Sequence, residues 1–181
     1  MCSMDGLLEL LPVRDSDIGI LEALTQDPNT TGEFQWFGWN DLRRWRHGWA
    51  ENGLIGPDDG TLMVVQDDES LGLVNWRRRP ITPAASCWEI GVIMLPHARG
   101  RGYGTQAHKL LAQYLFAHTT AHRIEADTEA DNVAEQRALE KAGFTREGVM
   151  RETGWRNGAW RDGVLYSLLR TDPQARPISE A

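Results

Sequence analysis

Hydrophobic and polar residues recur along this chain with two different periods. Short apolar or β-branched runs, bounded by polar, glycine or proline turns, predict strands at about residues 7–13, 61–66, 71–76, 87–95, 123–128, 144–151 and 164–169. Apolar residues spaced by three and four predict helices at about residues 15–26, 41–52 and 134–142 and directly after Gly104. This order predicts an α/β sheet with helices packed on its faces.

The segments between these elements set the expected domain organisation. Residues 28–40 are predicted to form a loop, residues 77–80 to end a strand, and a Gly-, Trp- and Arg-rich connection to join the last two strands. No internal repeat or linker divides the sequence. We therefore expect a single domain over residues 1–172, followed by a disordered tail over 173–181.

The run from Cys87 to Thr105 combines a strand, a glycine-rich turn and the start of a helix. The turn holds three glycines and two arginines, at Gly100, Gly102, Gly104, Arg99 and Arg101. Such a turn presents backbone N–H groups and a helix N-terminus to an anion, and glycine lets the backbone approach closely. The spacing fits neither the lysine-containing P-loop nor the dinucleotide fingerprint. These residues predict a phosphate or pyrophosphate cradle, and an ordinary structural turn is the alternative.

Two signatures in the sequence resemble those of the GNAT acetyltransferase superfamily. Arg99, Gly102 and Gly104 fill the pattern R-x-x-G-x-G after an apolar strand, as in the acyl-CoA pyrophosphate loop of that family. Asn132 is followed eleven residues later by Gly143-Phe144, which is similar to the second family signature, N-x(10)-G-F. The two signatures together are more specific than the glycine turn alone.

The C-terminal part of the chain adds a resemblance to one branch of that superfamily. Residues 144–151 and 160–169 resemble the ending of the ribosomal-protein N-terminal (Rim-type) acetyltransferases and related antibiotic-modifying enzymes. The likeness extends over about residues 7–170. It implies the GNAT fold, a mixed and mostly antiparallel sheet of six to seven strands, split at the acyl-CoA site and flanked by about four helices.

The resemblance also implies a reaction and a cofactor site. An acetyl group would move from acetyl-CoA to the primary amine of a small molecule, such as an antibiotic or a metabolite, or of a protein N-terminus. In the family, the central strand binds the pantetheine arm and the glycine turn binds the pyrophosphate. Carried onto this sequence, the cofactor-contacting residues are Ile93, Met94, Leu95, Arg99, Gly100, Arg101, Gly102, Tyr103, Gly104, Thr105 and Asn132.

Proton transfer in such a reaction needs a base and an acid. Glu89 is the candidate base, because it is a carboxylate within an otherwise apolar strand; a structural ion pair with an arginine of 77–79 is the equal alternative. Many family members place a tyrosine where this chain has Leu139. Glu135 occupies the position of the serine that is frequent in the Rim-type branch. It is a candidate acid, with a helix N-terminal role as the favoured alternative and water as another proton source.

Aromatic residues are the candidate walls of the acceptor site. The chain has eight tryptophans, and those predicted to contact the acceptor are Trp36, Trp39, Trp76 and Trp155. Such rings can stack on a flat substrate or hold an ammonium group. Trp45 and Trp49 have helical spacing and are predicted to belong to the core. His97 and His108 are predicted to be solvated surface residues.

Composition narrows the class of protein further. The 181 residues are 41% hydrophobic and 25% charged with a formal net charge of −7, which argues against a nucleic-acid surface. We find no membrane-spanning run or secretion signal and expect a cytoplasmic monomer or homodimer. The two cysteines predict neither a disulfide framework nor a metal site. A non-catalytic acyl-CoA-binding regulatory module remains the alternative to an enzyme, because the family's tyrosine is missing.

Overall fold

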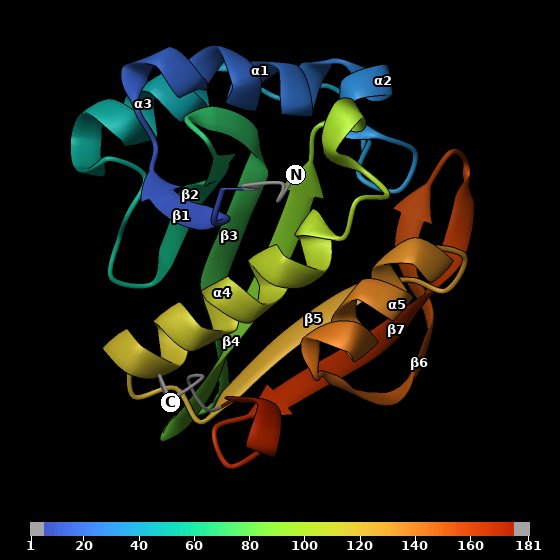
Figure 1. The fold of residues 1–181 in the computed structure, drawn as a ribbon. Coiled ribbons are helices and arrows are strands. Elements are labelled where there is room, and N and C mark those ends of the chain that lie inside the picture. The colour runs from blue at the N-terminus through green and yellow to red at the C-terminus, as the bar shows by residue number, and fades with distance from the viewer. Residues whose placement is uncertain (1–5, 176–181) are drawn as a thin grey trace, which may run out of the picture.

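The computed structural model describes residues 6–175 and contains one seven-stranded sheet (Figure 1). Its strands are β1 (Glu9–Pro12), β2 (Asp59–Gln66), β3 (Glu69–Thr82), β4 (Ala85–Met94), β5 (Arg123–Glu129), β6 (Thr145–Arg156) and β7 (Ala159–Leu169). The order across the sheet is β1-β2-β3-β4-β5-β7-β6. Neighbouring strands are antiparallel except for β4 and β5. The predicted mixed, mostly antiparallel sheet is confirmed.

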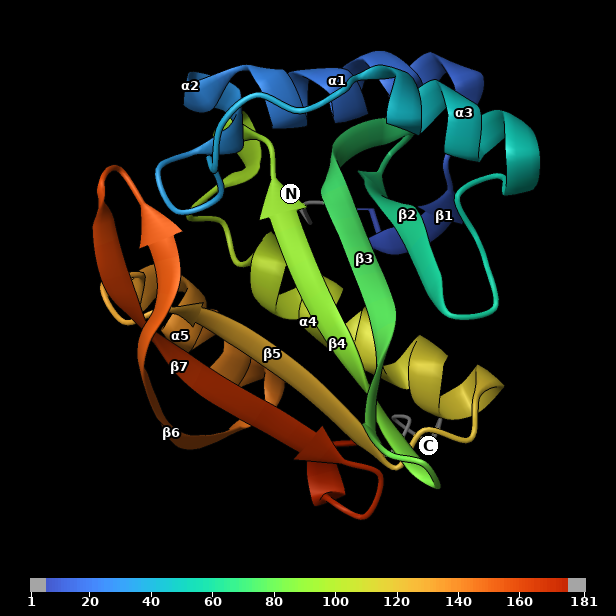
Figure 2. The ribbon, with the colours of Figure 1, turned by 180° about the vertical axis from the view of Figure 1, so that it is seen from behind.

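The sheet is split between its two parallel strands. In the part of the chain that the structure describes, β4 pairs with β5 at two positions only, Trp88 with Ile124 and Glu89 with Glu125. Beyond Glu89 the two strands diverge, and the opening between them is plain when the sheet is seen from behind (Figure 2). The last part of β4 therefore has a strand partner on its β3 side alone.

Helices cover both faces of the sheet. They are α1 (Ile18–Gln26), α2 (Pro28–Thr31), α3 (Arg43–Asn52), α4 (Tyr103–His118) and α5 (Val133–Ala142). Because side chains alternate along a strand, β4 contributes Ile90 and Val92 to one core cluster, with α4, and Ile93 to the other, with α1 and α3. Figure 1 shows α4 and α5 on the near face of the sheet.

Two strands run further than the sequence predicted. β3 does not end at residues 77–80 but continues to Thr82, because Arg77 and Arg79 pair in register with Glu89 and Cys87 of β4. Pro80 is tolerated at a register irregularity. The connection expected before β7 is itself a long β-hairpin. Its turn is Asn157-Gly158, with φ of +51° and +76°, which is the Asn-Gly signal of a tight hairpin.

Two further predictions need correction. Residues 28–31, predicted as loop, form the short helix α2, which begins after the capping side chain of Asp27 with Pro28 at its first position. The tail predicted to be disordered from residue 173 begins instead with a 3-10 turn, Pro173–Ala175, in which Ala175 is buried. Residues 176–181 lie outside the described part of the chain, as does Cys2.

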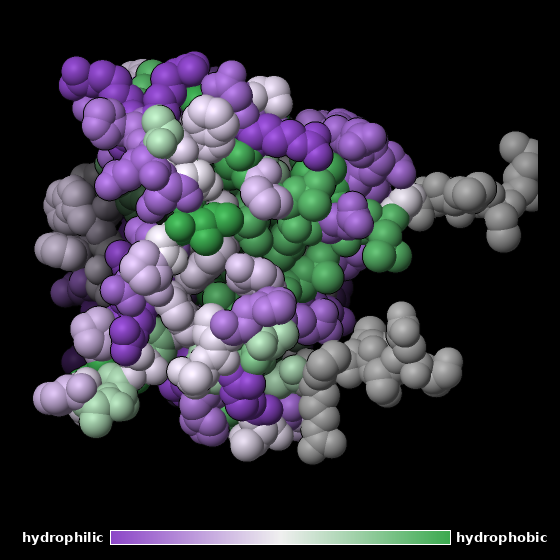
Figure 3. Space-filling view, turned by 90° about the vertical axis from the view of Figure 1, so that its left-hand side faces the viewer, coloured by the Kyte–Doolittle hydropathy of each residue, from purple (hydrophilic) through white to green (hydrophobic). Residues whose placement is uncertain are grey.

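One side of the molecule carries an apolar area on a mostly polar surface. Figure 3 shows hydrophobic residues gathered in one region of the face on the side of β1, surrounded by hydrophilic residues. Leu7, just before this edge strand, is 84% exposed. Within residues 6–175, the helices are either too short or too polar to cross a lipid bilayer.

Candidate active site

The glycine turn and the start of α4 form an open cradle of backbone. Gly100 and Gly102 have φ of +73° and +85°, a conformation that side chains disfavour, and Gly102 is the N-cap of α4. Among the described residues, nothing lies within 4 Å of a Cβ added at either glycine, and a Cβ at Gly104 meets only Met94 Cγ, at 4.0 Å. The space above the turn therefore fits a phosphate group held by main-chain N–H groups.

The two arginines of the turn are placed differently. Arg99 folds back: its Nε donates to the Met94 carbonyl at 2.9 Å and its Nη2 to the carbonyls of Thr30 and Thr31. Burial lowers the pKa of the Arg99 guanidinium. The side chain thereby joins the glycine turn to α2. Arg101 is exposed and lies 5.0 Å from the Tyr103 ring centre.

A cavity of about 460 Å³, here called the cofactor cavity, extends from this turn to the split in the sheet. Of the predicted cofactor residues it is lined by Ile93, Met94, Arg99, Gly100, Gly102, Gly104, Thr105 and Asn132. Leu95 lies outside it and donates its N–H to Leu71, and the buried Tyr103 donates its hydroxyl to Gln66 at 2.6 Å. Two cations of the lining, Arg137 and Lys141, belong to neither sequence signature; they are four apart on α5 and so share one face.

Asn132 and Glu135 begin helix α5 beside this cavity. The side-chain Oδ1 of Asn132 accepts the Glu135 N–H at 3.3 Å, and its Nδ2 donates to Thr128 Oγ1. One Glu135 carboxylate oxygen lies 2.6 Å from Nε2 of His108, which is fully buried within α4 rather than solvated as predicted. Leu139, at the position where many family members have tyrosine, is also fully buried, so it forms part of the core.

A larger cavity of about 820 Å³, here called the acceptor cavity, lies on the other face of the sheet. It is bounded by α3, the loop after α2, strands β2 to β5 and the β6–β7 hairpin. Four residues line both cavities, and they are Phe34, Gln35, Val92 and Ile93. The two spaces therefore meet at the last part of β4, where the sheet is split.

Charged side chains line much of the acceptor cavity. The carboxylates are Glu51, Asp59, Glu89, Asp127, Glu129 and Asp162, and the guanidinium groups are Arg44, Arg77 and Arg161. The Nε of Arg161 is buried without a hydrogen-bond partner in the described structure. An excess of carboxylates on the wall favours a cationic ligand.

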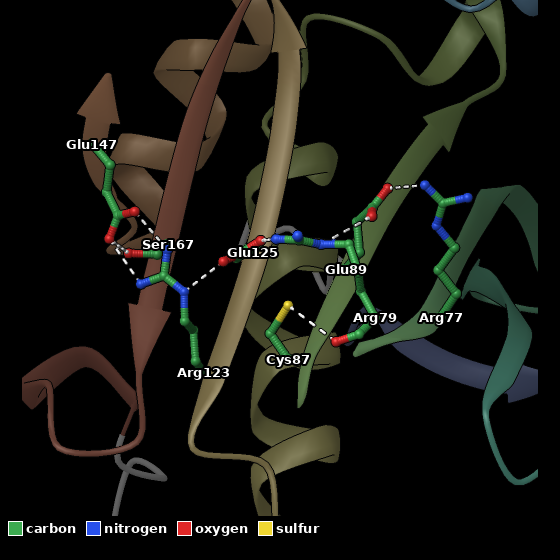
Figure 4. Close-up of polar contacts among 8 residues, drawn as sticks. All are labelled: Arg77, Arg79, Cys87, Glu89, Arg123, Glu125, Glu147 and Ser167. Atoms are coloured by element: carbon green, nitrogen blue, oxygen red, sulfur yellow. Dashed lines mark hydrogen bonds and ion pairs between the residues drawn. The ribbon is translucent and has the colours of Figure 1, made fainter. Parts of the chain in front are cut away.

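Glu89 lies on this wall within an ion pair. Arg77 donates to its carboxylate at 2.6 Å, and Arg79 lies 3.8 Å from the other oxygen (Figure 4). The ion pair with an arginine of β3, which the sequence offered as the alternative to a catalytic role for Glu89, is thus present, and it lies on the wall of the acceptor cavity. Arg79 also donates to Glu125 of β5, which carries the row of ion pairs from β3 to β5 below the split.

The same row of charges continues to the far edge of the sheet. Arg123 donates to Glu125 at 2.6 Å and, through two nitrogens, to Glu147 of β6 at 2.8 and 2.5 Å (Figure 4). Ser167 of β7 also donates to Glu147. These donors lower the pKa of Glu147 to about 2. The row of ion pairs joins the strands of both halves where β4 and β5 still pair.

The tryptophans predicted to contact the acceptor are mostly at the edge of the cavity. Trp76 lines it along β3, but its ring lies 5.7 Å from the Tyr114 ring of α4 and it is only 5% exposed, so the indole belongs to the core. Trp36 and Trp39 pack edge to face at 5.2 Å, and Trp155 does so with Trp160 at 5.3 Å. These residues lie outside the lining, next to lining residues such as Phe37 and Gly154.

The helical tryptophans have structural contacts. Trp45 donates its indole N–H to Thr25 at 3.2 Å, and Trp49 donates to the Val13 carbonyl at 2.8 Å. Both pack against the smaller core cluster, although Trp45 also reaches the acceptor cavity. Within residues 6–175, no three His, Cys, Asp or Glu side chains are grouped so as to hold a metal ion.

Comparison with known proteins gives a family match over most of the chain. The model of the acetyltransferase (GNAT) domain family matches residues 8–145. A probable N-acetyltransferase of Bacillus subtilis (strain 168), YjcK, is 34% identical over 87 residues, which is 48% of this chain and 48% of that relative. The chain thus spans about half the length of this relative.

Solved structures share the fold at lower sequence identity. A spermidine N-acetyltransferase from Vibrio cholerae, in complex with CoA and spermine, superposes with a TM-score of 0.78 at 19% identity, covering 91% of this chain and 96% of that one. RimJ of Mycobacterium smegmatis, in complex with CoA-disulfide, gives a TM-score of 0.77 at 22% identity, covering 94% and 87%.

This chain therefore belongs to the acetyltransferase (GNAT) domain family, as its glycine turn and its Asn132 signature predicted. The family and the fold are confirmed. Because the structural neighbours include a spermidine acetyltransferase as well as RimJ, the comparison supports the family as a whole rather than the Rim-type branch.

Proposed function

We propose that this protein is an N-acetyltransferase that moves an acetyl group from acetyl-CoA to a cationic primary amine, carried by a small molecule or by a protein N-terminus. The observation that carries this proposal is the junction of the two cavities at Val92 and Ile93. A thioester entering from the cofactor cavity and an amine entering from the acceptor cavity would meet there, in a split sheet that holds both in place.

The cofactor cavity supplies the contacts that coenzyme A requires. Backbone N–H groups at the start of α4 would bind the pyrophosphate, above glycines that leave room for it. Arg137 and Lys141 line the same cavity and would add charge for the phosphates. The strand edge of β4 beyond Glu89, which faces the opening, would hold the pantetheine arm.

The acceptor cavity supports an amine that carries positive charge. Six carboxylates and three guanidinium groups line it, with Phe34 and Phe37 as aromatic walls. The relatives are consistent with this chemistry: the Vibrio cholerae structure is a spermidine acetyltransferase with bound spermine, whereas another neighbour, RimL, acetylates a ribosomal protein N-terminus. Both acceptors are primary amines, so this proposal includes both.

Two further residues have proposed roles at the junction. Glu89 is the carboxylate that the sequence nominates to receive the amine proton, but its ion pair with Arg77 favours a positioning role for it. The leaving thiolate has two candidate proton sources, the Glu135 carboxyl and water. Glu135→Gln distinguishes them: thiol release should slow if the Glu135 carboxyl supplies the proton and should be unchanged if water supplies it.

The experiment measures free thiol released from acetyl-CoA in the presence of different amines. The panel contains a linear triamine, a peptide with a free N-terminus and basic residues, and an uncharged-chain monoamine of the same length as the triamine. We expect thiol release that depends on an amine, fastest with a polycationic acceptor. Calorimetry with CoA accompanies it. CoA binding without thiol release from any amine would favour the non-catalytic acyl-CoA-binding module, and absence of CoA binding would contradict both functions.

A further inference from the structure

Asp127 lies on β5 beside the opening of the split sheet. Glu125, two residues before it, is paired in parallel register with Glu89 of β4, and residues two apart on a strand share a face. Asp127 and Glu89 therefore point to the same side, and both line the acceptor cavity. Asp127 is the first residue on this face of β5 beyond the last pair with β4, so it borders the junction of the two cavities.

The carboxylates nearest the split differ in what already binds them. Glu89 accepts a hydrogen bond from Arg77 and lies close to Arg79. Glu129, two residues after Asp127, accepts two hydrogen bonds from Arg156, at 2.5 and 2.8 Å. Within the described residues, the Asp127 carboxylate accepts no hydrogen bond. Its oxygens are therefore available to an incoming ammonium group.

The surroundings of Asp127 make it a better proton acceptor than a solvated aspartate. Desolvation by the cavity walls, and then the negative charge of Glu89, raise the pKa of Asp127, while Arg77 and Arg79 act in the opposite direction. Two further charged groups line the same cavity as Asp127. Arg161 of β7 is a cation, and the negative charge of Glu129 is balanced by its ion pair with Arg156. The Asp127 side chain is nevertheless exposed at the open cavity, so a proton that it accepts can leave to solvent.

We propose that Asp127 is the catalytic base of this site and that Glu89, fixed by Arg77, is a positioning residue; the inference rests on the proposed acetyl transfer. The Asp127 carboxylate accepts one proton from the ammonium form of the acceptor and releases it to solvent. The nitrogen lone pair then forms the C–N bond at the thioester carbonyl carbon. The C–S bond breaks with its electron pair on sulfur. The nitrogen loses its second proton to solvent, and the sulfur takes up one proton, from the Glu135 carboxyl or water, to become the coenzyme A thiol.

The test compares Asp127→Asn with the unaltered protein over pH 6 to 10, with the best amine of the panel. We expect kcat to fall by about 100-fold at neutral pH, within the usual range for a lost general base, while the KM for acetyl-CoA is unchanged. The loss should shrink as pH rises, because more acceptor is then already uncharged. Asp127→Glu should restore part of the rate. Asp131→Asn, which removes the same charge from a neighbouring exposed loop position, should leave kcat and its pH profile unchanged.

The outcomes separate this inference from the function on which it rests. If Asp127→Asn raises the amine KM without changing kcat, or loses rate equally at every pH, Asp127 only binds the ammonium group and the inference is wrong. The inference is equally wrong if the fall in kcat that shrinks at high pH is seen with Glu89→Gln and not with Asp127→Asn. Calorimetry with CoA checks that Asp127→Asn is folded. Absence of thiol release from the unaltered protein would overturn the proposed function and this inference together.

Discussion

The two cavities of this protein are built by different means. The phosphate cradle of the cofactor cavity depends on main-chain geometry, a glycine turn with positive φ and the first turn of α4, supplied by residues that are close together in the sequence. The acceptor cavity depends on side chains from at least five separate elements, many of them charged and several already paired with one another. A ligand common to a whole family suits the first kind of site, and a variable ligand suits the second.

The difference has a physical consequence for mutation. Backbone N–H donors cannot be removed by changing a side chain, so the glycine turn should tolerate most substitutions except those that fill the space above it. In the acceptor cavity the field of each carboxylate acts on its neighbours, so a single change should alter the protonation of residues that it does not contact. Four substitutions test this contrast.

Gly104→Val should have the largest effect. The position has an ordinary φ and almost open space around its Cβ, so the fold tolerates the change, whereas a ligand above the turn does not. We expect CoA affinity to fall by about 100-fold, or about 2.7 kcal/mol, measured by calorimetry. Gly102→Val is a poorer probe than the sequence suggests, because φ there is +85° and the side chain would also strain the backbone.

Gly19→Val is the matched control for Gly104→Val. Gly19 lies in α1, and nothing surrounds its Cβ position within 4 Å among the described residues. Its affinity for CoA should remain that of the unaltered protein. Equal affinity in Gly104→Val would show that the cradle lies elsewhere.

Glu89→Gln should shift a pH profile rather than abolish activity. The charge of Glu89 raises the pKa of Asp127, so removing it lowers that pKa. The acid limb of kcat/KM should therefore move to lower pH. The amine KM should rise about tenfold, because Arg77 loses its partner and repels a cationic acceptor, whereas Arg79 keeps Glu125. Glu22→Gln breaks an ion pair with Arg46 away from both cavities and should change neither quantity. An acid limb that moves to higher pH would contradict this coupling.

Glu147→Gln should lower stability by about 1 kcal/mol, a value kept small because the side chain is 36% exposed. The folded pKa of about 2 lies below the ordinary value of 4.5, so this contribution is fully present above pH 4.5 and is lost as pH falls through about 2. Urea unfolding of both proteins at pH 7 and pH 3 measures it. A difference that grows on acidification would contradict the assignment, and CoA affinity should not change.

Trp155→Ala should have the smallest effect. The ring is 55% exposed beside Trp160 at the edge of the acceptor cavity, so it can contact only an acceptor that extends beyond the cavity. For such an amine we expect KM to rise by a few-fold, about 0.5–1 kcal/mol, with kcat unchanged. Val149→Ala, an exposed apolar position on the same strand, should not alter KM. An unchanged KM for every amine would leave Trp155 outside the substrate site.

Local sequence patterns predicted most of the fold. Strand alternation and helical spacing predict nearly every element, and the Asn157-Gly158 pair is the local signal of the hairpin that joins β6 to β7. Residues 77–79 are predicted as a strand end because their acidic partners are remote in the sequence: Arg77 and Arg79 pair with carboxylates of β4 and β5, and Arg78 with Asp58. The surface position predicted for His108 is wrong for a similar reason, since its partner Glu135 lies on another helix.

By itself the sequence determined the family and the place of the cofactor turn, because glycine conformation and helix starts depend on residues next to each other in the chain. Only the tertiary structure decided which carboxylates share the acceptor cavity. Strand register places Glu89 against Arg77 and brings Asp127 to the opening, and a register shift of one residue would turn these side chains to the opposite face.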